Sequence, residues 1–424
     1  MALDRRNFLK LLGAGAASLP LTGHAGDAPP RPGRRVVVIG GGFGGTIAAK
    51  YVRMLDPAIE VVLIERNRQH VSCPFSNQVI AGIRQMSDLT IGYDKLAANY
   101  GIRILCDEVT AIDPAAREVV THSGKIGYDR LIISPGIDFR FDEIEGYDPA
   151  STPEILPHAW KAGAQTLLLK KQVESMADGG TVIISMPLTP FRCPPGPYER
   201  ACMIAMYLKK NKPRSKLILL DANPDIVSAG PLFTRAWDTY YKDIIEYLPA
   251  KRVTRVDART KTLFVEGVEG IQGDVVNFVP PQRAGAIAVS SGLVGADRNW
   301  CPVKVSTFES TIHNNIHVIG DAAVAGAMPK AGYSANAQAK VCAMNVVALM
   351  NGRETMDFAG INVCYSAITE EEDISVAAVY KVAQGNIVAV HDSGGMSPID
   401  FSAARLEHVY AESWLKNILT EMST

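Results

Sequence analysis

Residues 35–45 read RVVVIGGGFGG, an apolar run that ends in a cluster of glycines. A helical pattern follows over residues 46–54, and a second apolar run, Val61–Ile64, ends at Glu65. Strand, glycine turn, helix and strand in this order predict a βαβ unit that binds a dinucleotide. The glycines that match the G-x-G-x-x-G spacing are Gly40, Gly42 and Gly45.

Each residue of this motif has a physical task. Gly40 permits the tight turn, Gly42 lets a pyrophosphate approach the backbone, and Gly45 lets the helix pack closely on the strand. The helix N-terminus offers unpaired N–H groups and the positive end of its dipole to the phosphates. Glu65 is placed to accept hydrogen bonds from the hydroxyls of a ribose.

Two later segments indicate which dinucleotide binds. YDRLIISPG (residues 128–136) resembles the strand and turn that close the first half of an FAD domain in flavoproteins with two dinucleotide-binding folds. IHVIGDA (residues 316–322) resembles their later signature, whose aspartate, here Asp321 after Gly320, touches the ribityl chain. Three signatures in this order predict FAD as the cofactor.

A helical pattern over residues 335–349 follows PKAGYS (residues 329–334). In such flavoproteins this helix N-terminus points at the pyrimidine ring, where its dipole stabilises negative charge on the reduced flavin. Tyr333 and Ser334 are therefore predicted to bind the cofactor.

A second βαβ pattern lacks the glycine fingerprint. Strands are predicted at residues 181–185 and 216–220, and MPLTPFRCPPGP (residues 186–197) stands where an NAD-binding fold would carry its glycines. Five prolines remove five N–H donors from the place where a pyrophosphate would need them. The sequence predicts a dinucleotide-type domain without a nicotinamide site, and an electron donor other than NAD(P)H.

The N-terminus indicates where the protein works. DRRNFLK (residues 4–10) precedes an apolar stretch rich in Gly and Ala, and GHA (residues 23–25) offers a cleavage site. This arrangement resembles a bacterial twin-arginine export signal, and we expect residues 1–25 to be that signal. The route carries folded proteins, so a cofactor-bearing protein of the periplasm is expected.

Composition excludes several classes. The formal net charge of −1 over 424 residues, without basic runs, argues against a nucleic-acid-binding protein. No other stretch holds 18 consecutive apolar residues, so no transmembrane helix is expected. The seven cysteines include no C-x-x-C pair, which argues against a zinc ribbon or a haem attached to this chain, and no metal is expected.

Three cysteines are candidates for chemistry. Cys193 lies between prolines and beside Arg192, whose charge would favour a thiolate, and Glu199 follows six residues later. Cys73 follows the Glu65 strand on the flavin side, and Cys364 lies in a C-terminal segment. For these last two, inert packing is as compatible with the sequence as chemistry. The cysteines expected to be buried and inert are Cys106, Cys202, Cys301 and Cys342.

Over essentially its whole length the sequence resembles the flavoprotein subunit of flavocytochrome c sulfide dehydrogenase, a relative of sulfide:quinone reductases and glutathione-reductase-like flavoproteins. The segments that carry this resemblance are the export signal and residues 191–200, 280–285, 307–321, 328–336 and 362–366.

The resemblance assigns roles to residues. It implies that Cys73 carries FAD covalently through the 8α-methyl group, and that Cys193 and Cys364 form a redox disulfide over the flavin ring. Glu199 matches the family's acid near that disulfide, and Trp414 resembles a tryptophan close to the flavin and the haem side.

The implied activity is oxidation of sulfide, or a closely related reduced sulfur compound, to zero-valent sulfur or polysulfide. Hydrosulfide would open the disulfide, FAD would take two electrons, and a separate c-type cytochrome subunit would accept them singly in a heterodimer. The chain would then be an FAD-dependent sulfide:cytochrome c oxidoreductase.

Three alternatives remain open. A sulfide:quinone reductase shares the cysteine chemistry but needs a membrane surface, and the helical pattern of residues 404–419 lacks the basic bias of a membrane-surface helix. An NAD(P)H-dependent flavin reductase is disfavoured by the prolines. An FAD protein of electron transfer without sulfide turnover would retain the same fold.

The predicted architecture is α/β, with two Rossmann-like domains of the glutathione-reductase-like type and a C-terminal α+β domain. The predicted segments are an FAD-binding domain in two parts (34–150 and 281–350), a second dinucleotide-type domain (151–280), and a C-terminal interface domain that caps the flavin (351–424).

Overall fold

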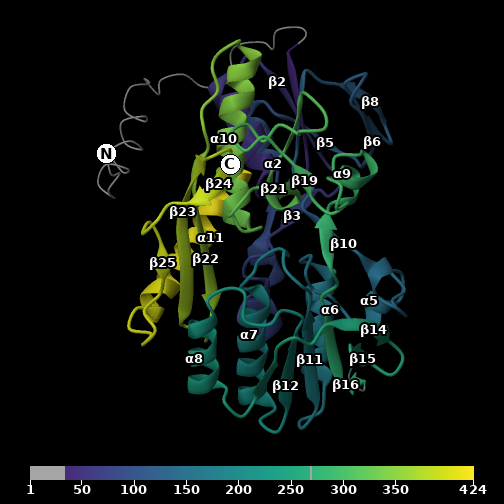
Figure 1. Cartoon of the computed structure of the whole chain (residues 1–424), viewed down its shortest axis with the longest axis vertical. Coiled ribbons are helices and arrows are strands. Elements are labelled where there is room, and N and C mark those ends of the chain that lie inside the picture. The colour runs from purple at the N-terminus through teal and green to yellow at the C-terminus, as the bar shows by residue number, and fades with distance from the viewer. Residues whose placement is uncertain (1–33, 268–269) are drawn as a thin grey trace.

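The chain is described by a computed structural model that covers residues 34–267 and 270–424. The export signal predicted for residues 1–25 lies outside the described residues. The fold is mixed α/β, and two parallel sheets lie toward opposite ends of the long axis of the molecule, with a third sheet beside them (Figure 1). The predicted fold class is confirmed.

The first sheet is parallel and contains the glycine motif. Its strands, in spatial order, are β20 (Ile316–Val318), β9 (Arg130–Ile133), β1 (Arg35–Ile39), β2 (Glu60–Glu65) and β5 (Arg103–Cys106). The chain runs from β1 to β2 and β5 on one side and returns to β9 on the other. This reversal opens a crevice at the carboxyl ends of the strands, where ligands bind in such sheets.

Two helices pack together over this sheet, α2 (Gly45–Leu55) and α10 (Gly332–Met350). The turn between β1 and α2 needs glycine at both ends. Gly40 has a φ of +98°, and a Cβ on Gly45 would lie 1.8 Å from the Gly40 carbonyl oxygen. The predicted strand–turn–helix unit is therefore confirmed, with boundaries within a residue or so.

The second sheet repeats the same winding with strands β13 (Ile245–Leu248), β12 (Lys216–Asp221), β11 (Thr181–Met186) and β17 (Val275–Phe278). All of its pairings are parallel. The helices of this part are α6 (Ala164–Ser175), α7 (Gly196–Asn211) and α8 (Gly230–Tyr240) (Figure 1). Because α7 begins directly after the proline-rich segment, that segment lies at the carboxyl end of β11.

The C-terminal part is an antiparallel sheet covered by the last helix. Its elements are β22 (Ala359–Ala367), β23 (Asp373–Ala383), β24 (Asn386–Ala389), β25 (Gly395–Met396) and α11 (Ala404–Ser423). Helix α11 packs on β23, and α10 packs on β22, so this part lies against the first sheet's helix layer. Figure 1 shows it in yellow along one side of the molecule.

Shorter elements connect these parts. The helices are α3 (Ser76–Ala81), α4 (Asp94–Tyr100), α5 (Thr152–Ile155) and α9 (Ala286–Ser290), with 3₁₀ turns at Met86–Leu89, Phe141–Glu143 and Gly320–Ala322. The remaining strands are β3 (Gln69–Val71), β4 (Thr90–Gly92), β6 (Val109–Asp113), β7 (Glu118–Thr121), β8 (Gly124–Gly127), β10 (Ile137–Phe139), β14 (Val253–Asp257), β15 (Thr262–Val265), β16 (Ile271–Gln272), β18 (Gln282–Ala284), β19 (Cys301–Pro302) and β21 (Ala323–Val324). Strand β10 lies where the chain leaves the first parallel sheet, and β18 lies where it returns from the second. These two strands pair with each other and join the two connections. The predicted domain boundaries remain predictions.

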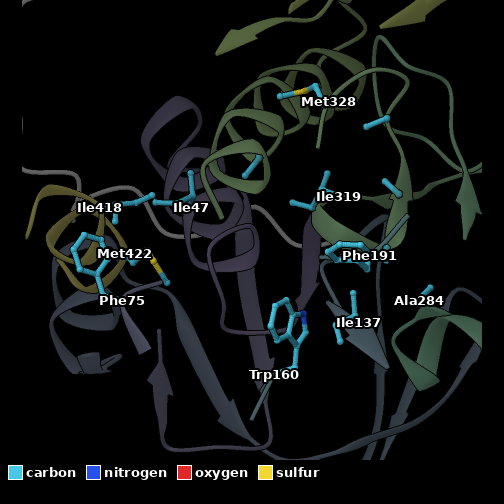
Figure 2. Packing of buried hydrophobic residues seen from close by; sticks show 14 of the residues in the cluster. Ile47, Phe75, Ile137, Trp160, Phe191, Ala284, Ile319, Met328, Ile418 and Met422 are labelled. Atoms are coloured by element: carbon cyan, nitrogen blue, oxygen red, sulfur yellow. The ribbon is translucent and has the colours of Figure 1, made fainter. Parts of the chain in front are cut away.

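One continuous core joins the three parts. Figure 2 shows Phe75, just before α3, beside Ile418 and Met422 of α11. Trp160 and Phe191, which precede and follow β11, belong to the same buried cluster. Within residues 34–267 and 270–424, no helix is both long enough and apolar enough to cross a membrane.

Candidate functional site

A pocket of about 730 Å³ lies where the three parts meet. Six segments line it: the stretch from Cys73 into α3, residues 159–160, the proline loop with the start of α7, the start of α10, the middle of β22, and α11. The lining residues used below are Cys73, Asn77, Trp160, Arg192, Cys193, Glu199, Arg200, Tyr333, Cys364, Tyr365 and Trp414. The pocket thus contains all three cysteines singled out in the sequence.

The glycine turn and Glu65 meet at the carboxyl edge of the first sheet. One carboxylate oxygen of Glu65 accepts the N–H of Gly41 at 2.7 Å, and the other accepts the main-chain and side-chain N–H groups of Asn67 at 2.9 Å. The carboxylate is held in a fixed orientation beside the turn. This is the geometry expected of a ribose acceptor.

Asp321 has a buried carboxylate oxygen, Oδ1, without a hydrogen-bond partner in the described part of the chain. Burial raises the pKa of this carboxyl, although Arg192 and Lys330 oppose the shift. The neighbouring Gly320, with φ +74°, donates its N–H to Gln338 at 2.8 Å. An unpartnered buried acceptor is costly, so a ligand hydroxyl is the natural partner of Asp321.

His70 is a residue that sequence reasoning missed. Its Nε2 is buried without a partner among the described residues, and its ring packs edge-on against Phe43 in the glycine turn, 5.4 Å between centroids. Burial and the charge of Arg192 lower the pKa of His70 to about 4, so the ring is neutral. Its position three residues before Cys73 was the available signal.

Aromatic rings stack beside the start of α10. Trp414 of α11 stands between Tyr333 and Phe75, with ring centroids 6.0 and 6.2 Å away and planes within 20° of parallel. Ser334 donates to the Asn362 side chain at 3.0 Å, and Asn362 in turn donates to the Cys364 sulfur at 3.3 Å. The first turn of α10 is thereby coupled to one of the candidate sulfurs.

The three pocket cysteines come from three different parts of the fold. Cys193 has a φ of +59° and donates its N–H to the Lys330 carbonyl, just before α10, at 2.7 Å. The Cys73 thiol points at the Trp160 carbonyl at 3.7 Å. All three are thiols in this structure, and burial raises the pKa of both Cys193 and Cys364.

The charge of Arg192 favours the thiolate of Cys193, as expected, but it does not decide the pKa of this thiol. Arg192 does lower the pKa of this thiol, but desolvation outweighs it, and Cys364 and Glu199 add to the upward shift. The expectation for one of the other cysteines fails. Cys106, predicted to be buried, ends the edge strand β5 and is exposed, whereas Cys202, Cys301 and Cys342 are buried as expected.

Glu199, in the first turn of α7, is 8% exposed. Its Oε2 accepts from the Asn77 side chain at 2.8 Å, and its Oε1 accepts the Ala367 N–H at 3.5 Å. Burial is the largest cause that raises the pKa of Glu199, to about 7. A carboxyl with this pKa can both hold and release a proton near neutral pH.

Arg200, the next residue, is a second group that sequence reasoning missed. It is 2% exposed and donates to the side chains of Asn77 and Asn277 and to the carbonyls of His158 and Ala159. Its guanidinium also lies over the Trp160 ring, 4.7 Å from the centroid. Burial lowers its pKa to about 10, so Arg200 still brings a positive charge into the pocket wall.

In the second sheet, the groups that correspond to a nucleotide site are hydrogen-bonded within the described part of the chain. The N–H groups of Thr189, Arg192 and Cys193 in the proline loop donate to Asn223, Gln282 and Lys330. Asp221, the acid at the end of β12, is saturated by its own neighbours. Its carboxylate accepts from the Tyr198 and Tyr247 hydroxyls at 2.8 and 3.0 Å and from Asn223. Little remains here to bind a pyrophosphate or a ribose.

Family models match three segments of the chain. They are the central part of the flavoprotein chain of sulfide dehydrogenase [flavocytochrome c] at residues 166–280, the flavin-binding part of flavocytochrome c sulphide dehydrogenase at residues 358–422, and pyridine nucleotide-disulphide oxidoreductase at residues 34–170. The sulfide dehydrogenase flavoprotein chain of Chlorobaculum thiosulfatiphilum is 61% identical over 46 residues, 96% of that sequence and 11% of this one. The chain belongs to the flavoprotein-chain family of flavocytochrome c sulfide dehydrogenase.

More distant relatives share the fold. The sulfide-quinone reductase of Aquifex aeolicus is 33% identical over 92 residues, which cover 22% of this chain and 21% of that enzyme. The X-ray structure of the sulfide:quinone oxidoreductase from the same organism superposes with a TM-score of 0.73 at 20% identity, over 92% of this chain and 91% of that one. A putidaredoxin reductase complex superposes with a TM-score of 0.62 at 16% identity, over 92% of this chain and 98% of that one.

The residues present fit the FAD of this flavoprotein family. The glycine turn, Glu65 and the unpartnered oxygen of Asp321 lie along the carboxyl edge of the first sheet, and α10 begins at the pocket. Among the described residues, no group of three or more His, Cys, Asp or Glu side chains could hold a metal ion.

Proposed function

We propose that this chain oxidises sulfide, or a closely related reduced sulfur compound, to zero-valent sulfur or polysulfide, and passes the electrons singly to a c-type cytochrome. The observation that supports this most directly is that Cys193, Cys364 and Glu199 line the same pocket as the start of α10. The FAD, when bound, supplies a two-electron acceptor that can give up its electrons one at a time.

The cofactor would be held by residues already described. Gly40, Gly42 and Gly45 would bind its pyrophosphate with the N-terminus of α2, and Glu65 its ribose. Asp321 would accept from the ribityl chain, and Tyr333 and Ser334 would border the flavin ring. The Cys73 thiol, which lines the pocket, would form the covalent link to the flavin methyl group.

The chemistry begins at a Cys193–Cys364 disulfide. Hydrosulfide attacks one sulfur, so that the disulfide bond breaks, a persulfide forms on one cysteine and the other leaves as a thiolate. Because burial raises the pKa of both thiols, the leaving thiolate needs a proton. Glu199, whose pKa lies near 7, supplies that proton.

Closing the disulfide again releases zero-valent sulfur, two electrons and two protons. One proton returns to the Glu199 carboxylate and the other leaves the protein. The net change is that HS⁻ becomes zero-valent sulfur, one proton and two electrons, with FAD as the first electron acceptor. Arg200 lies in the pocket wall, where its charge favours the anionic substrate over neutral H₂S.

The electron acceptor would dock beside Trp414. The outer end of α11 exposes Leu406, Val409 and Tyr410, each about half exposed. An open groove of about 890 Å³ next to them contains Trp414 and Tyr365, which also border the inner pocket. A separate cytochrome subunit in the periplasm would cover this apolar face. The export signal that would bring the protein there lies outside the described residues.

The same exposed face supports a second candidate. Sulfide:quinone reductases share the fold and would use such a surface to reach a membrane quinone. The charges on α11 are mixed, with Glu407 and Glu412 against Arg405 and Lys416, which favours a protein partner over an anionic membrane.

The deciding experiment is an anaerobic titration of the purified flavoprotein, followed at the visible flavin band. Bleaching by sulfide and not by NADH supports the proposal, and bleaching by NADH alone overturns it. Reoxidation of the sulfide-reduced protein by ferricytochrome c, and not by a soluble quinone, then separates the cytochrome-linked enzyme from the quinone reductase. Absence of bleaching by either donor would favour a non-catalytic electron-transfer protein.

A further inference from the structure

A buried acid and a surface histidine form a pair close to Glu199. Asp373, the first residue of β23, is 1% exposed, and its Oδ2 lies 2.7 Å from Nδ1 of His408 on α11. The His408 side chain is 26% exposed. The pair therefore leads from the interior to solvent, and nothing in the mechanism above uses it.

The inner end of this pair adjoins Glu199 through the β22–β23 hairpin. Asp373 is the register partner of Ala367, the residue whose N–H donates to Glu199. The two carboxyls are close enough that the charge of Asp373 contributes to the raised pKa of Glu199. Three titratable groups thus stand in sequence from the pocket to the surface: Glu199, Asp373 and His408.

We propose that Asp373 and His408 carry protons from Glu199 to solvent. This inference rests on the proposed function, in which each hydrosulfide oxidised leaves one proton to be expelled from a pocket that the cofactor fills. A proton passes from the Glu199 carboxyl through one intervening water to the Asp373 carboxylate, since the two carboxyls are not hydrogen-bonded to each other. The Asp373 carboxyl then gives its proton to His408 Nδ1, and His408 releases the proton on its Nε2 to water. After these transfers Asp373 is again a carboxylate and His408 is again neutral. Both residues act through Glu199 and do not touch the substrate.

The groups around His408 and Asp373 shift the pKa values of both residues. The hydrogen bond that His408 donates to the Asp373 carboxylate is the largest cause that raises the pKa of His408, while burial opposes it. Burial also raises the pKa of Asp373, which makes its carboxylate a better proton acceptor. The other charged and titratable groups that face the pair are Glu407 and Glu412 on α11, Arg84 after α3, and Tyr365 on β22.

The chain contains a matched control. Nδ1 of His391 lies 2.8 Å from Oδ2 of Asp392, so the two residues form the same kind of pair. Both side chains are exposed, at 93% and 86%. His391→Gln removes one imidazole from a histidine–aspartate pair, as His408→Gln does, but it should not interrupt a path to Glu199.

The test is steady-state oxidation of sulfide by the full flavoprotein with ferricyanide as a one-electron acceptor, between about pH 6 and pH 9. In dilute buffer we expect His408→Gln to lower turnover about tenfold, and added imidazole to restore it to within about twofold of the wild type. Asp373→Asn should be slowed at least as much, without rescue, because imidazole cannot reach the buried position. The double variant should be no slower than Asp373→Asn, since both residues serve one path.

The outcomes separate the relay from the proposed function. Wild-type turnover in His408→Gln, or a loss that imidazole does not restore and that His391→Gln shares, would overturn the relay while sulfide oxidation stands. A wild-type protein that consumes no sulfide would overturn both. Thermal unfolding of each variant checks that a slow protein is still folded.

Discussion

The main-chain N–H of Cys193 donates a 2.7 Å hydrogen bond to the carbonyl oxygen of Lys330. The donor belongs to the proline loop after β11 in the second sheet, and the acceptor precedes α10 in the first. This bond, with the left-handed φ of +59° at Cys193, fixes the backbone of the proline loop beside the segment that leads into α10. The candidate sulfur of one part thereby lines the same pocket as the first residues of α10.

Cys193→Ser and Cys364→Ser should each abolish reduction of the flavin by sulfide and leave the flavin bound, because the sulfurs act on the substrate and the cofactor is held elsewhere. Rapid mixing with sulfide under anaerobic conditions measures this. Cys106→Ser, at an exposed position outside the pocket, is the control. Sulfide reduction that persists in the Cys193 variant would refute the disulfide role.

Cys73→Ser should release the flavin on acid denaturation, whereas the unmodified protein should keep it in the precipitate. The reason is that a thioether survives acid and a non-covalent complex does not. Flavin absorbance in the supernatant is the readout. If the wild-type protein also releases its flavin, the covalent link is disproved, and Cys73 is a free thiol of the pocket.

Glu199→Gln should slow sulfide-dependent flavin reduction about 10²-fold below pH 7. Burial raises the pKa of Glu199 to about 7, so the carboxyl is protonated and able to donate below that pH and ionised above it. The ratio of the wild-type to the variant rate should therefore fall as pH rises through about 7. Taking the ratio removes the titration of sulfide itself, and a ratio constant with pH would contradict the role as a proton donor.

Arg200→Lys should lower the free energy of unfolding by about 3 kcal/mol, since an ammonium cannot replace the four donor contacts of the buried guanidinium. Denaturant unfolding of the flavin-bound protein measures the loss. The control is Arg214→Lys, whose side chain is 76% exposed and pairs with Asp178, and it should change stability by less than about 0.5 kcal/mol. Equal losses in both variants would show that the Arg200 contacts add nothing to stability.

Gly45→Ala should give a protein with little bound flavin, because the new Cβ would collide with the Gly40 carbonyl in the turn. Gly92→Ala is the control, since its Cβ would meet no atom within 4 Å. The ratio of visible flavin absorbance to protein absorbance reports the outcome. Full flavin content in the Gly45 variant would mean that the turn can open without losing the cofactor.

Local patterns predicted the elements well. The expected helix at residues 46–54 is Gly45–Leu55, and the expected strand Val61–Ile64 is Glu60–Glu65. The helix expected at residues 335–349 begins earlier, at Gly332, because the G-Y-S stretch reads as a loop in sequence but continues the helix once packed on Phe43. The predictions of helices and strands agree with the structure where the order of apolar residues and glycines along the chain is sufficient to define the element.

The site depended on what the sequence does not encode locally. Arg192 stands next to Cys193 in sequence, which suggested a thiolate, yet burial decides the pKa of this thiol. The sequence does not single out His70 and Arg200, because no neighbouring residue in the chain indicates that their side chains are buried. Desolvation is a property of the assembled fold, and it reverses electrostatic expectations drawn from neighbours in the chain.

By itself, the sequence determined the βαβ unit, the proline loop that stands where a second glycine fingerprint would be, and the segments that carry the candidate cysteines, because glycine and proline act on the backbone where they stand. Tertiary structure alone brought Cys73, Cys193 and Cys364 to one pocket, raised the pKa of Glu199 to about 7 and paired the buried Asp373 with His408. These properties depend on distances and burial between segments far apart in the chain, and only the packing of three sheets and their helices sets them.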